Sequence, residues 1–261
     1  MSQTPSPRLA PSVRGARGKS PRRLVSAAFV ALAVCGGCAT PAAFNDPARA
    51  GPFFAPSNVL GEPSLGGIRR VVLLPVCEGT VASVEMTTAL DAVFVAALQE
   101  QNRFEVVTLS REQCLRRFQL TSISSAMALP SDFLAVLKRD YAADAVLFVD
   151  LTVFRAYRPL ALGLRGKLAA IDGSRLVWTF DNLFAADDPT VANAARHHFL
   201  KGDRGGVPAD LTPSVLQSPA KFAAYAAAAM FATLPPVNAP VLTGNSKNGT
   251  TSGSSFPQKS R

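Results

Sequence analysis

The residues best suited to acid–base chemistry or metal binding are two adjacent histidines, His197 and His198. Their alanine-rich surroundings indicate a helix, on which neighbouring side chains point about 100° apart and cannot easily bind one ion. Asp187, Asp188 and Asp203 would complete a metal site only if the chain folded back on itself. Strong metal motifs have fixed ligand spacings, and this segment has none. We therefore predict no metal ion and no cofactor.

Asp150 is the most chemically interesting carboxylate, because it lies in the apolar run 145–154. A buried carboxylate must be paired, or its pKa must shift. The sequence lacks both a Gly-x-Ser-x-Gly nucleophile elbow and a glycine-rich phosphate loop after the first predicted strand. Residues 244–251 have the glycine spacing of such a loop but carry Thr250 where lysine is required. We predict a non-enzymatic protein, and a wall-active hydrolase that uses Asp150 or His197 is the alternative.

Two of the four cysteines, Cys77 and Cys114, lie in the central part of the chain. Cys77 follows a predicted strand and Cys114 lies in the helix after the neighbouring strand, so both are expected at one edge of a sheet. An oxidising envelope compartment permits a disulfide if the two Cα atoms lie within about 7 Å. The sequence leaves open whether the two thiols form a bridge or stay separate.

Four basic residues, Arg155, Arg158, Arg165 and Lys167, are expected near one another on the outer side of a predicted meander. Such a stripe would suit anionic lipid headgroups, wall polymer or an acidic protein partner. A solvated sheet face is the plainer interpretation of the same residues.

The formal charge of +9 comes mostly from the start of the chain. Six of the 27 basic residues precede Leu24, and all 18 acidic residues follow Cys38. Without the first 37 residues, 21 basic and 18 acidic residues leave a charge of +3. The basicity therefore belongs mainly to an N-terminal leader, and we predict no nucleic-acid partner.

The apolar run 24–34 is typical of a signal peptide, because 11 residues are too few to span a bilayer. Two glycines precede Cys38, which resembles a bacterial lipobox, although Cys35 stands where leucine is usual. We predict that residues 1–37 are a lipoprotein signal peptide and that Cys38 is lipidated and becomes the mature N-terminus. Several acyl chains would form an effectively permanent membrane anchor. An ordinary cleaved signal peptide is the alternative.

Composition divides the mature chain into three parts. Residues 38–67 hold the lipidated cysteine and a proline- and glycine-rich linker, which would span roughly 30 Å as a flexible coil. Residues 68–234 form a single predicted domain. Residues 235–261 are polar and turn-forming, so they are predicted to be disordered.

Hydrophobic periodicity predicts an α/β fold for this domain. The expected elements are strands at 69–76, 104–109 and 145–154, an antiparallel hairpin at 160–170 and 176–180, and helices at 86–98 and 219–234. Two further helices are expected after Ser110 and Ser131, with each serine as the N-cap. In the hairpin, Leu176, Trp178 and Phe180 are expected on the buried face. The predicted fold class is a mixed three-layer α/β sheet, which begins with a parallel βαβ unit, ends in an antiparallel meander and is flanked by helices.

This order of segments resembles the periplasmic α/β domain of CsgG-like lipoproteins and, more distantly, the lipoprotein activators of penicillin-binding proteins. The similarity covers residues 68–186 and rests on the segments RRVVLLPV, RFEVVTLSRE, DYAADAVLFVDLTVFRAYRPL and LRGKLAAIDGSRLVWTF. The parts most like the family are Ala143 and Asp144 before a strand and the turn at Asp172 and Gly173. The resemblance implies a non-enzymatic, outer-membrane-anchored periplasmic domain that binds other envelope proteins, with no catalytic residues to transfer.

The main prediction is therefore an anchored binding or regulatory module for an envelope assembly, secretion or cell-wall partner, with self-association also open. The alternative within the same family is a secretion-channel subunit, which would need added amphipathic membrane strands of about ten residues each. The stretch 119–130 is short and alternates poorly, and the other alternating segments belong to the meander. These features favour the accessory lipoprotein over the channel.

Overall fold

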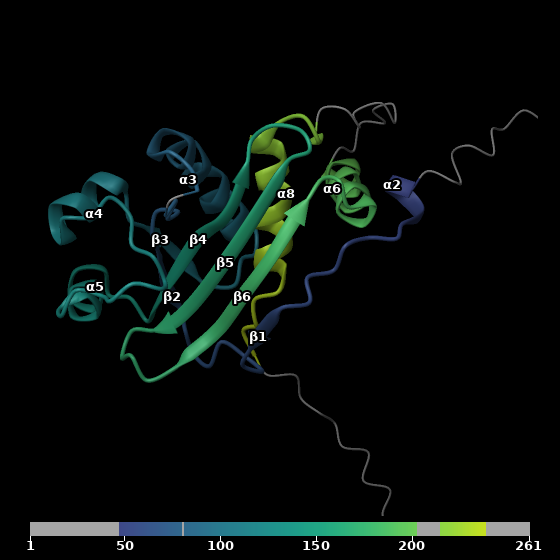
Figure 1. Ribbon diagram of the computed structural model, residues 1–261. Helices are drawn as coiled ribbons and strands as arrows, with labels where there is room; N and C mark the ends of the chain where they lie inside the picture. The colour runs from purple at the N-terminus through teal and green to yellow at the C-terminus, as the bar shows by residue number, and fades with distance from the viewer. Residues whose placement is uncertain (1–46, 80, 203–214, 239–261) are drawn as a thin grey trace, which may run out of the picture. The chain divides into compact units, whose positions relative to one another are not determined.

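A six-stranded mixed sheet forms the centre of the part of the chain that the computed structural model describes, which is residues 47–79, 81–202 and 215–238 (Figure 1). The strands are β1 Val59–Gly61, β2 Arg70–Leu73, β3 Glu105–Thr108, β4 Ala145–Arg155, β5 Ala161–Ala170 and β6 Leu176–Ala185. Their spatial order is β1-β6-β5-β4-β2-β3. β2 pairs in parallel with β3 and β4, whereas β4, β5, β6 and β1 pair antiparallel.

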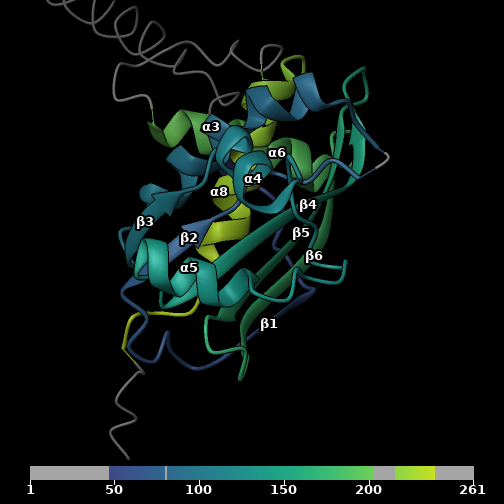
Figure 2. The same cartoon turned by 90° about the vertical axis from the view of Figure 1, so that its left-hand side faces the viewer.

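Helices cover both faces of the sheet and give three layers (Figures 1 and 2). The helices α3 Val84–Gln99, α6 Pro189–Gly202 and α8 Pro219–Ala232 lie on one face, and α4 Arg111–Phe118 and α5 Phe133–Tyr141 lie on the other. A larger core cluster, which includes Phe94, Trp178 and Phe231, fills the first interface. A smaller cluster around Phe133 and Phe148 fills the second. This architecture confirms the predicted fold class. None of the described helices is long and apolar enough to cross a membrane.

The parallel start of the sheet agrees with the prediction. β2 lies between two parallel neighbours, and Val71, Val72 and Leu73 are all buried because helices cover both sides of this strand. α3 connects β2 to β3, as the apolar stripe at 86–98 indicates.

The helix caps agree with the prediction in one case and differ in another. Ser110 caps α4 in a capping box with Gln113, in which each side chain bonds to the other residue's backbone N–H. The cap predicted at Ser131 is wrong, because Asp132 occupies the N-cap position of α5 and makes no side-chain cap bond.

β4, β5 and β6 form the predicted antiparallel meander, and the leucines of β5 are buried on the side of α3 and α8. Trp178 and Phe180 of β6 are buried on the same side, as predicted. The prediction for Leu176 is wrong. A register shift between Leu168 and Ala169 pairs Leu176 with Ala169, so the Leu176 side chain lies exposed on the opposite face.

Residues 47–67, predicted as part of a linker, are folded against the domain. β1 pairs with the otherwise open edge of β6, with Val59 opposite Phe180, and Leu65 is fully buried in the larger cluster. The helix α2 Pro47–Ala50 packs against α6. The predicted domain boundary at residue 68 is therefore wrong, and the described domain begins at Pro47. The predicted signal peptide, Cys38 and residues 239–261 of the predicted tail lie outside the described residues.

Candidate functional site

A crevice of about 690 Å³ opens at the carboxyl ends of the parallel strands β2 and β3. Its walls include Val76, which follows β2, Asp91 of α3 and Thr108 at the end of β3. The chain leaves β2 for a helix on one face of the sheet and leaves β3 for a helix on the other face. Such a switch point produces a crevice in open α/β sheets, and ligands commonly bind there.

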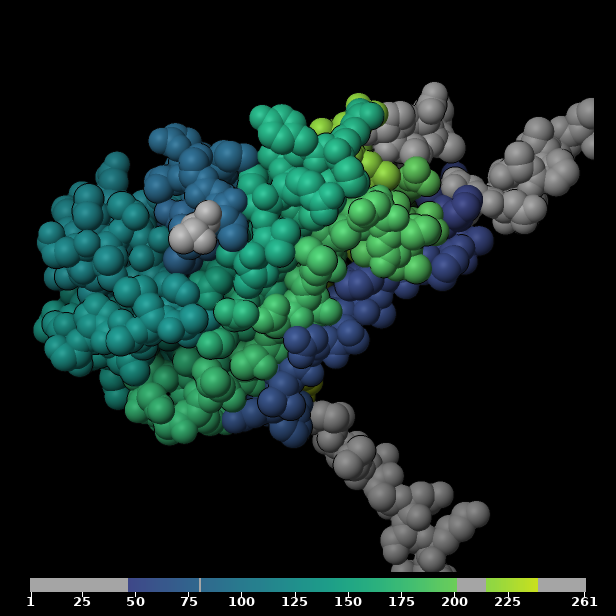
Figure 3. All heavy atoms as spheres, in the orientation of Figure 1, coloured from purple at the N-terminus to yellow at the C-terminus, as the bar shows by residue number. Residues whose placement is uncertain are grey.

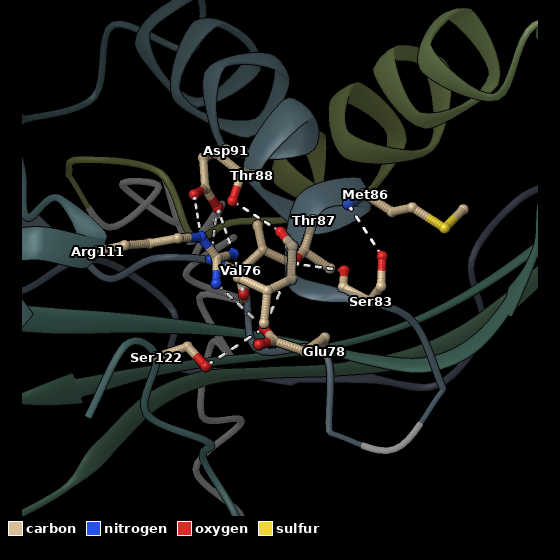
Figure 4. Close-up of polar contacts among 10 residues, drawn as sticks. Val76, Glu78, Ser83, Met86, Thr87, Thr88, Asp91, Arg111 and Ser122 are labelled. Atoms are coloured by element: carbon tan, nitrogen blue, oxygen red, sulfur yellow. Dashed lines mark hydrogen bonds and ion pairs between the residues drawn. The ribbon is translucent and has the colours of Figure 1, made fainter. Parts of the chain in front are cut away.

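Arg111, the first residue of α4, binds to two other segments beside this crevice (Figure 4). Its Nε donates to Asp91 Oδ2 at 2.7 Å, and its Nη2 donates to Asp91 Oδ1 at 3.2 Å. Nη2 also donates to the Val76 carbonyl at 2.7 Å, and Nη1 donates to Glu78 Oε2 at 3.2 Å. The Arg111 side chain is only 11% exposed. Burial would lower the pKa of Arg111, but the hydrogen bonds and charges of Asp91 and Glu78 outweigh burial and raise it.

We name Arg111, Asp91 and Glu78 the clasp. Glu78 Oε2 also accepts hydrogen bonds from Thr87 Oγ1 at 3.4 Å and from Ser122 Oγ at 3.3 Å. The clasp thus joins the end of β2, α3, α4 and the loop that carries Ser122. All three of its charged side chains are engaged in these contacts, so the clasp gives the crevice a fixed polar wall. It offers no free general acid, base or nucleophile.

Sequence reasoning missed the clasp, because its members come from three segments and each has an ordinary explanation in its own segment. The one local signal is Arg111 itself. A cation in the first turn of a helix is unfavourable beside the positive end of the helix dipole, unless carboxylates compensate it. Here Asp91 and Glu78 provide that compensation.

Asp150, the carboxylate that the sequence places in an apolar strand, is buried and is paired by hydrogen bonds. Its two oxygens each lie 3.1 Å from the Ser125 backbone nitrogen, and Oδ2 accepts from the Ser125 hydroxyl at 2.5 Å. Lys167 Nζ donates to the Ser125 carbonyl at 3.0 Å. Asp150 and Lys167 therefore hold the 119–130 loop against the sheet, which is a structural use of this carboxylate.

The two histidines lie on α6 and contact different neighbours, as their adjacency predicts. His197 Nδ1 lies 2.9 Å from the Ala48 carbonyl oxygen, and its ring centroid lies 4.4 Å from that of Phe53. Burial lowers the pKa of His198. Among the described residues, no group of three or more histidine, cysteine, aspartate or glutamate side chains could hold a metal ion. Asp203 lies outside the described residues.

Cys77 and Cys114 are both buried and both free, so the disulfide that the sequence left open is not formed. Cys77 is fixed by an isolated bridge to Asp150 of β4, whereas Cys114 belongs to the smaller core cluster with Phe118 and Phe133. The two cysteines therefore contact different parts of the structure. Burial raises the pKa of Cys114 to about 11, which keeps this thiol protonated at neutral pH.

The predicted stripe of basic residues divides into two pairs. Arg165 Nε donates to Asp181 Oδ2 at 2.9 Å, and Lys167 is bound to a loop carbonyl, so both make internal contacts. Arg155 and Arg158 are exposed at the end of β4 and in the β4–β5 hairpin. The structure therefore leaves the hairpin pair, rather than all four residues, at an open surface.

The sheet is covered unequally on its two sides. The smaller core cluster places α4 and α5 over β3, β2 and the first half of β4. Among the described residues, no helix lies over the same side of β5, β6 and β1 (Figure 1). We name this side the outer face, and Figure 3 shows β5 and β6 at the surface there.

Three large apolar side chains are exposed on the outer face, namely Leu60 (75%), Leu176 (54%) and Leu183 (50%), and Val153 (39%) is exposed next to them on the second half of β4. Strand register places them on one side. Val153 and Leu183 both lie opposite Gly163, and Arg165 lies opposite Asp181. The outer face is therefore apolar at several positions and carries a cross-strand ion pair among them.

Comparisons with known proteins find matches among solved structures. No protein-family model matches the sequence, and no curated protein matches it. The PelC dodecamer from Paraburkholderia phytofirmans is 12% identical with a TM-score of 0.40, and the match covers 68% of this chain and 96% of that one. Lipoprotein GNA1162 from Neisseria meningitidis is 16% identical with a TM-score of 0.33, covering 44% and 79%. The C-terminal domain of LpoB from Salmonella enterica is 16% identical with a TM-score of 0.30, covering 46% and 86%. The resemblance to CsgG-like proteins stays a prediction.

Proposed function

We propose that this chain is a non-enzymatic lipoprotein of the bacterial cell envelope, whose folded domain binds another envelope protein through the outer face. In this proposal acylated Cys38 anchors the chain to the outer membrane, and the domain faces the periplasm. The uncovered sheet face with its exposed apolar side chains is the observation that carries the proposed binding. The lipobox-like sequence before Cys38 supports the proposed anchor.

The composition of the outer face supports protein binding. A single exposed leucine on a protein surface needs no explanation. Leu60, Leu176, Leu183 and Val153, however, are spread along one uncovered side of the sheet, which also carries the ion pair of Arg165 and Asp181. Apolar side chains among paired polar groups are typical of protein interfaces, and burying each leucine would contribute about 1.5–3 kcal/mol.

The internal contacts of the ionisable groups support binding rather than catalysis. The clasp uses Glu78, Asp91 and Arg111 to join four segments, and Asp150 holds the 119–130 loop. These contacts make the scaffold rigid, and a preformed surface loses less entropy when a partner binds.

In-cell photo-crosslinking from position 183 tests the proposed surface. A photoreactive residue there is expected to give a discrete adduct with a second envelope protein, and an added Leu60→Asp substitution should reduce that adduct about tenfold. Leu115 provides a matched control, because it is an exposed leucine on α4, away from the outer face. No adduct from position 183, or the same adduct from position 115, would count against the proposal.

A pair of substitutions separates binding from hydrolysis at Asp150. Asp150→Asn keeps an acceptor for Ser125, so the folded variant should rescue every envelope phenotype of deleting the gene. Leu183→Asp should fail to rescue, although it leaves Asp150 intact. The hydrolase alternative predicts the opposite pattern.

A further inference from the structure

The end of the sheet at which β4 turns into β5 carries another exposed surface, separate from the outer face. Tyr157 in this hairpin is 86% exposed, and Arg155 and Arg158 are exposed beside it. A groove of about 410 Å³ separates the hairpin from the start of α3, where Val81 and Met86 are exposed. We name this surface the hairpin end, which consists of Val81, Val84, Met86, Phe154, Arg155, Tyr157 and Arg158.

The chemistry of the hairpin end suits the boundary between lipid and water. Tyrosine and arginine have apolar bodies and polar ends, and both favour that boundary. Besides apolar side chains, Ser83, Arg155 and Tyr157 line the groove, and none of the described residues that line it is acidic. Glu85, in the first turn of α3, is the acidic residue nearest to it in sequence. Each arginine held near an anionic lipid surface strengthens association about fivefold.

The chain between the predicted lipid and the domain is short. The domain begins at Pro47, because the segment from there onwards is bound to α6: Asn193 Nδ2 donates to the Pro52 carbonyl at 3.3 Å, and Phe54 N donates to the Thr190 carbonyl at 3.1 Å. Only residues 39–46 separate Cys38 from Pro47. Even a fully extended chain of that length spans about 30 Å, so a lipid on Cys38 holds the domain close to the bilayer.

The start of the described domain, at α2, and the hairpin end lie toward the same end of the sheet. Ala161 lies opposite both Arg155 of β4 and Ala185 of β6. β6 leads directly into α6, which begins at Pro189, and α2 packs against α6. Figure 1 shows α2 and the β4–β5 hairpin toward the end of the sheet that lies away from the β5–β6 turn.

We propose that the hairpin end rests on an anionic lipid bilayer, with Tyr157, Met86, Val84 and Val81 at the headgroup level and with Arg155 and Arg158 beside the headgroup phosphates. The inference rests on the proposed lipidation of Cys38, because the short tether is what brings this surface to the membrane. In this orientation the hairpin end meets the membrane, and the outer face stays open toward the periplasm.

An environment-sensitive fluorophore at position 157 tests this arrangement in the full lipidated protein. Tyr157→Cys provides the labelling site, since Cys77 and Cys114 are buried, and Ser174→Cys in the exposed β5–β6 turn provides the control at the opposite end. The vesicles contain phosphatidylcholine and phosphatidylglycerol in equal parts. The label at position 157 is expected to shift to the blue and to be quenched several-fold more by lipid-borne nitroxides than the label at position 174. Arg155→Glu combined with Arg158→Glu should bring the quenching at position 157 down to the level at position 174.

Equal quenching at the two positions in the membrane-bound protein would overturn the inference. A blue shift at position 157 without vesicles would also overturn it, because the surface would then be packed against protein. Mass spectrometry of the Cys38 peptide is read first. A missing acyl group would overturn the proposed anchor and this inference together, whereas an acylated protein whose domain stands clear of lipid would overturn only the inference.

Discussion

Arg111 is a buried cation at the positive end of a helix, and it stays there because two carboxylates and a carbonyl surround it. Its partners depend on it in turn. Without the guanidinium, the buried Glu78 carboxylate and the Asp91 carboxylate at the crevice would be like charges with no cation between them. Removing one member of a buried ionic group costs far more than removing an exposed ion pair.

Arg111→Ala is expected to lower the free energy of unfolding by about 3–5 kcal/mol, because it leaves Glu78 buried without its charge partner. Arg116→Ala on the same helix is the control. It removes an exposed contact with Glu112 and should cost about 1 kcal/mol or less. Urea unfolding of the two variants measures both values, and similar losses would contradict the role given to the clasp.

The buried thiol of Cys114 gives a pH-dependent prediction. Burial raises its pKa from the ordinary value of 9.0 to about 11 in the folded protein. A raised pKa adds stability below pH 9, where the thiol is protonated in both states, and this stability is lost as the pH rises toward 11. The free energy of unfolding should therefore fall between about pH 9 and 11, and it should fall less in Cys114→Ala. Urea titrations across that range check this, and the same pH dependence in both proteins would contradict it.

The 119–130 loop is held in position by a few single polar contacts. Ile123 is buried in the smaller core cluster, Ser122 bonds to Glu78, and Ser125 is held by Asp150 and Lys167. The loop has no regular secondary structure, so these side chains decide whether it stays on the sheet.

Asp150→Ala is expected to release this loop and to cost about 1–3 kcal/mol, since the Ser125 donors lose their acceptor. Backbone amides in the loop should exchange hydrogen faster, by a factor that matches the lost free energy. Asp181→Ala, which removes the half-exposed partner of Arg165 on the same sheet, should leave loop exchange unchanged. Unaltered exchange in Asp150→Ala would show that Ile123 and Ser122 hold the loop without Asp150.

Elements with a local pattern could be predicted from the sequence, and those with distant partners could not. The apolar run of β2 and the serine cap of α4 each indicate the local structure within a few residues. β1 does not, because Val59 pairs with Phe180 and its own segment is rich in proline and glycine. The need to pair Asp150 was predictable, but its partner is a residue in a loop without periodicity. The clasp was hidden for the same reason, since its three members lie on separate elements.

Across the whole domain, different surfaces have different proposed tasks. In the two proposals the outer face binds protein and the hairpin end meets lipid, while the clasp joins the elements that lie between these surfaces. The secretion-channel alternative needs segments that are free to form membrane strands. In the part of the chain that the structure describes, the 119–130 loop is bound to Asp150 and Glu78, and the β5 and β6 strands are paired along their length.

Native mass spectrometry of the particle extracted from membranes in mild detergent tests the central claim most directly. We expect one or a few copies of this chain together with a second envelope protein, and a mature chain that begins at acylated Cys38. A large ring built from this chain alone would contradict the binding module in favour of the channel. An unmodified N-terminus would contradict the anchor.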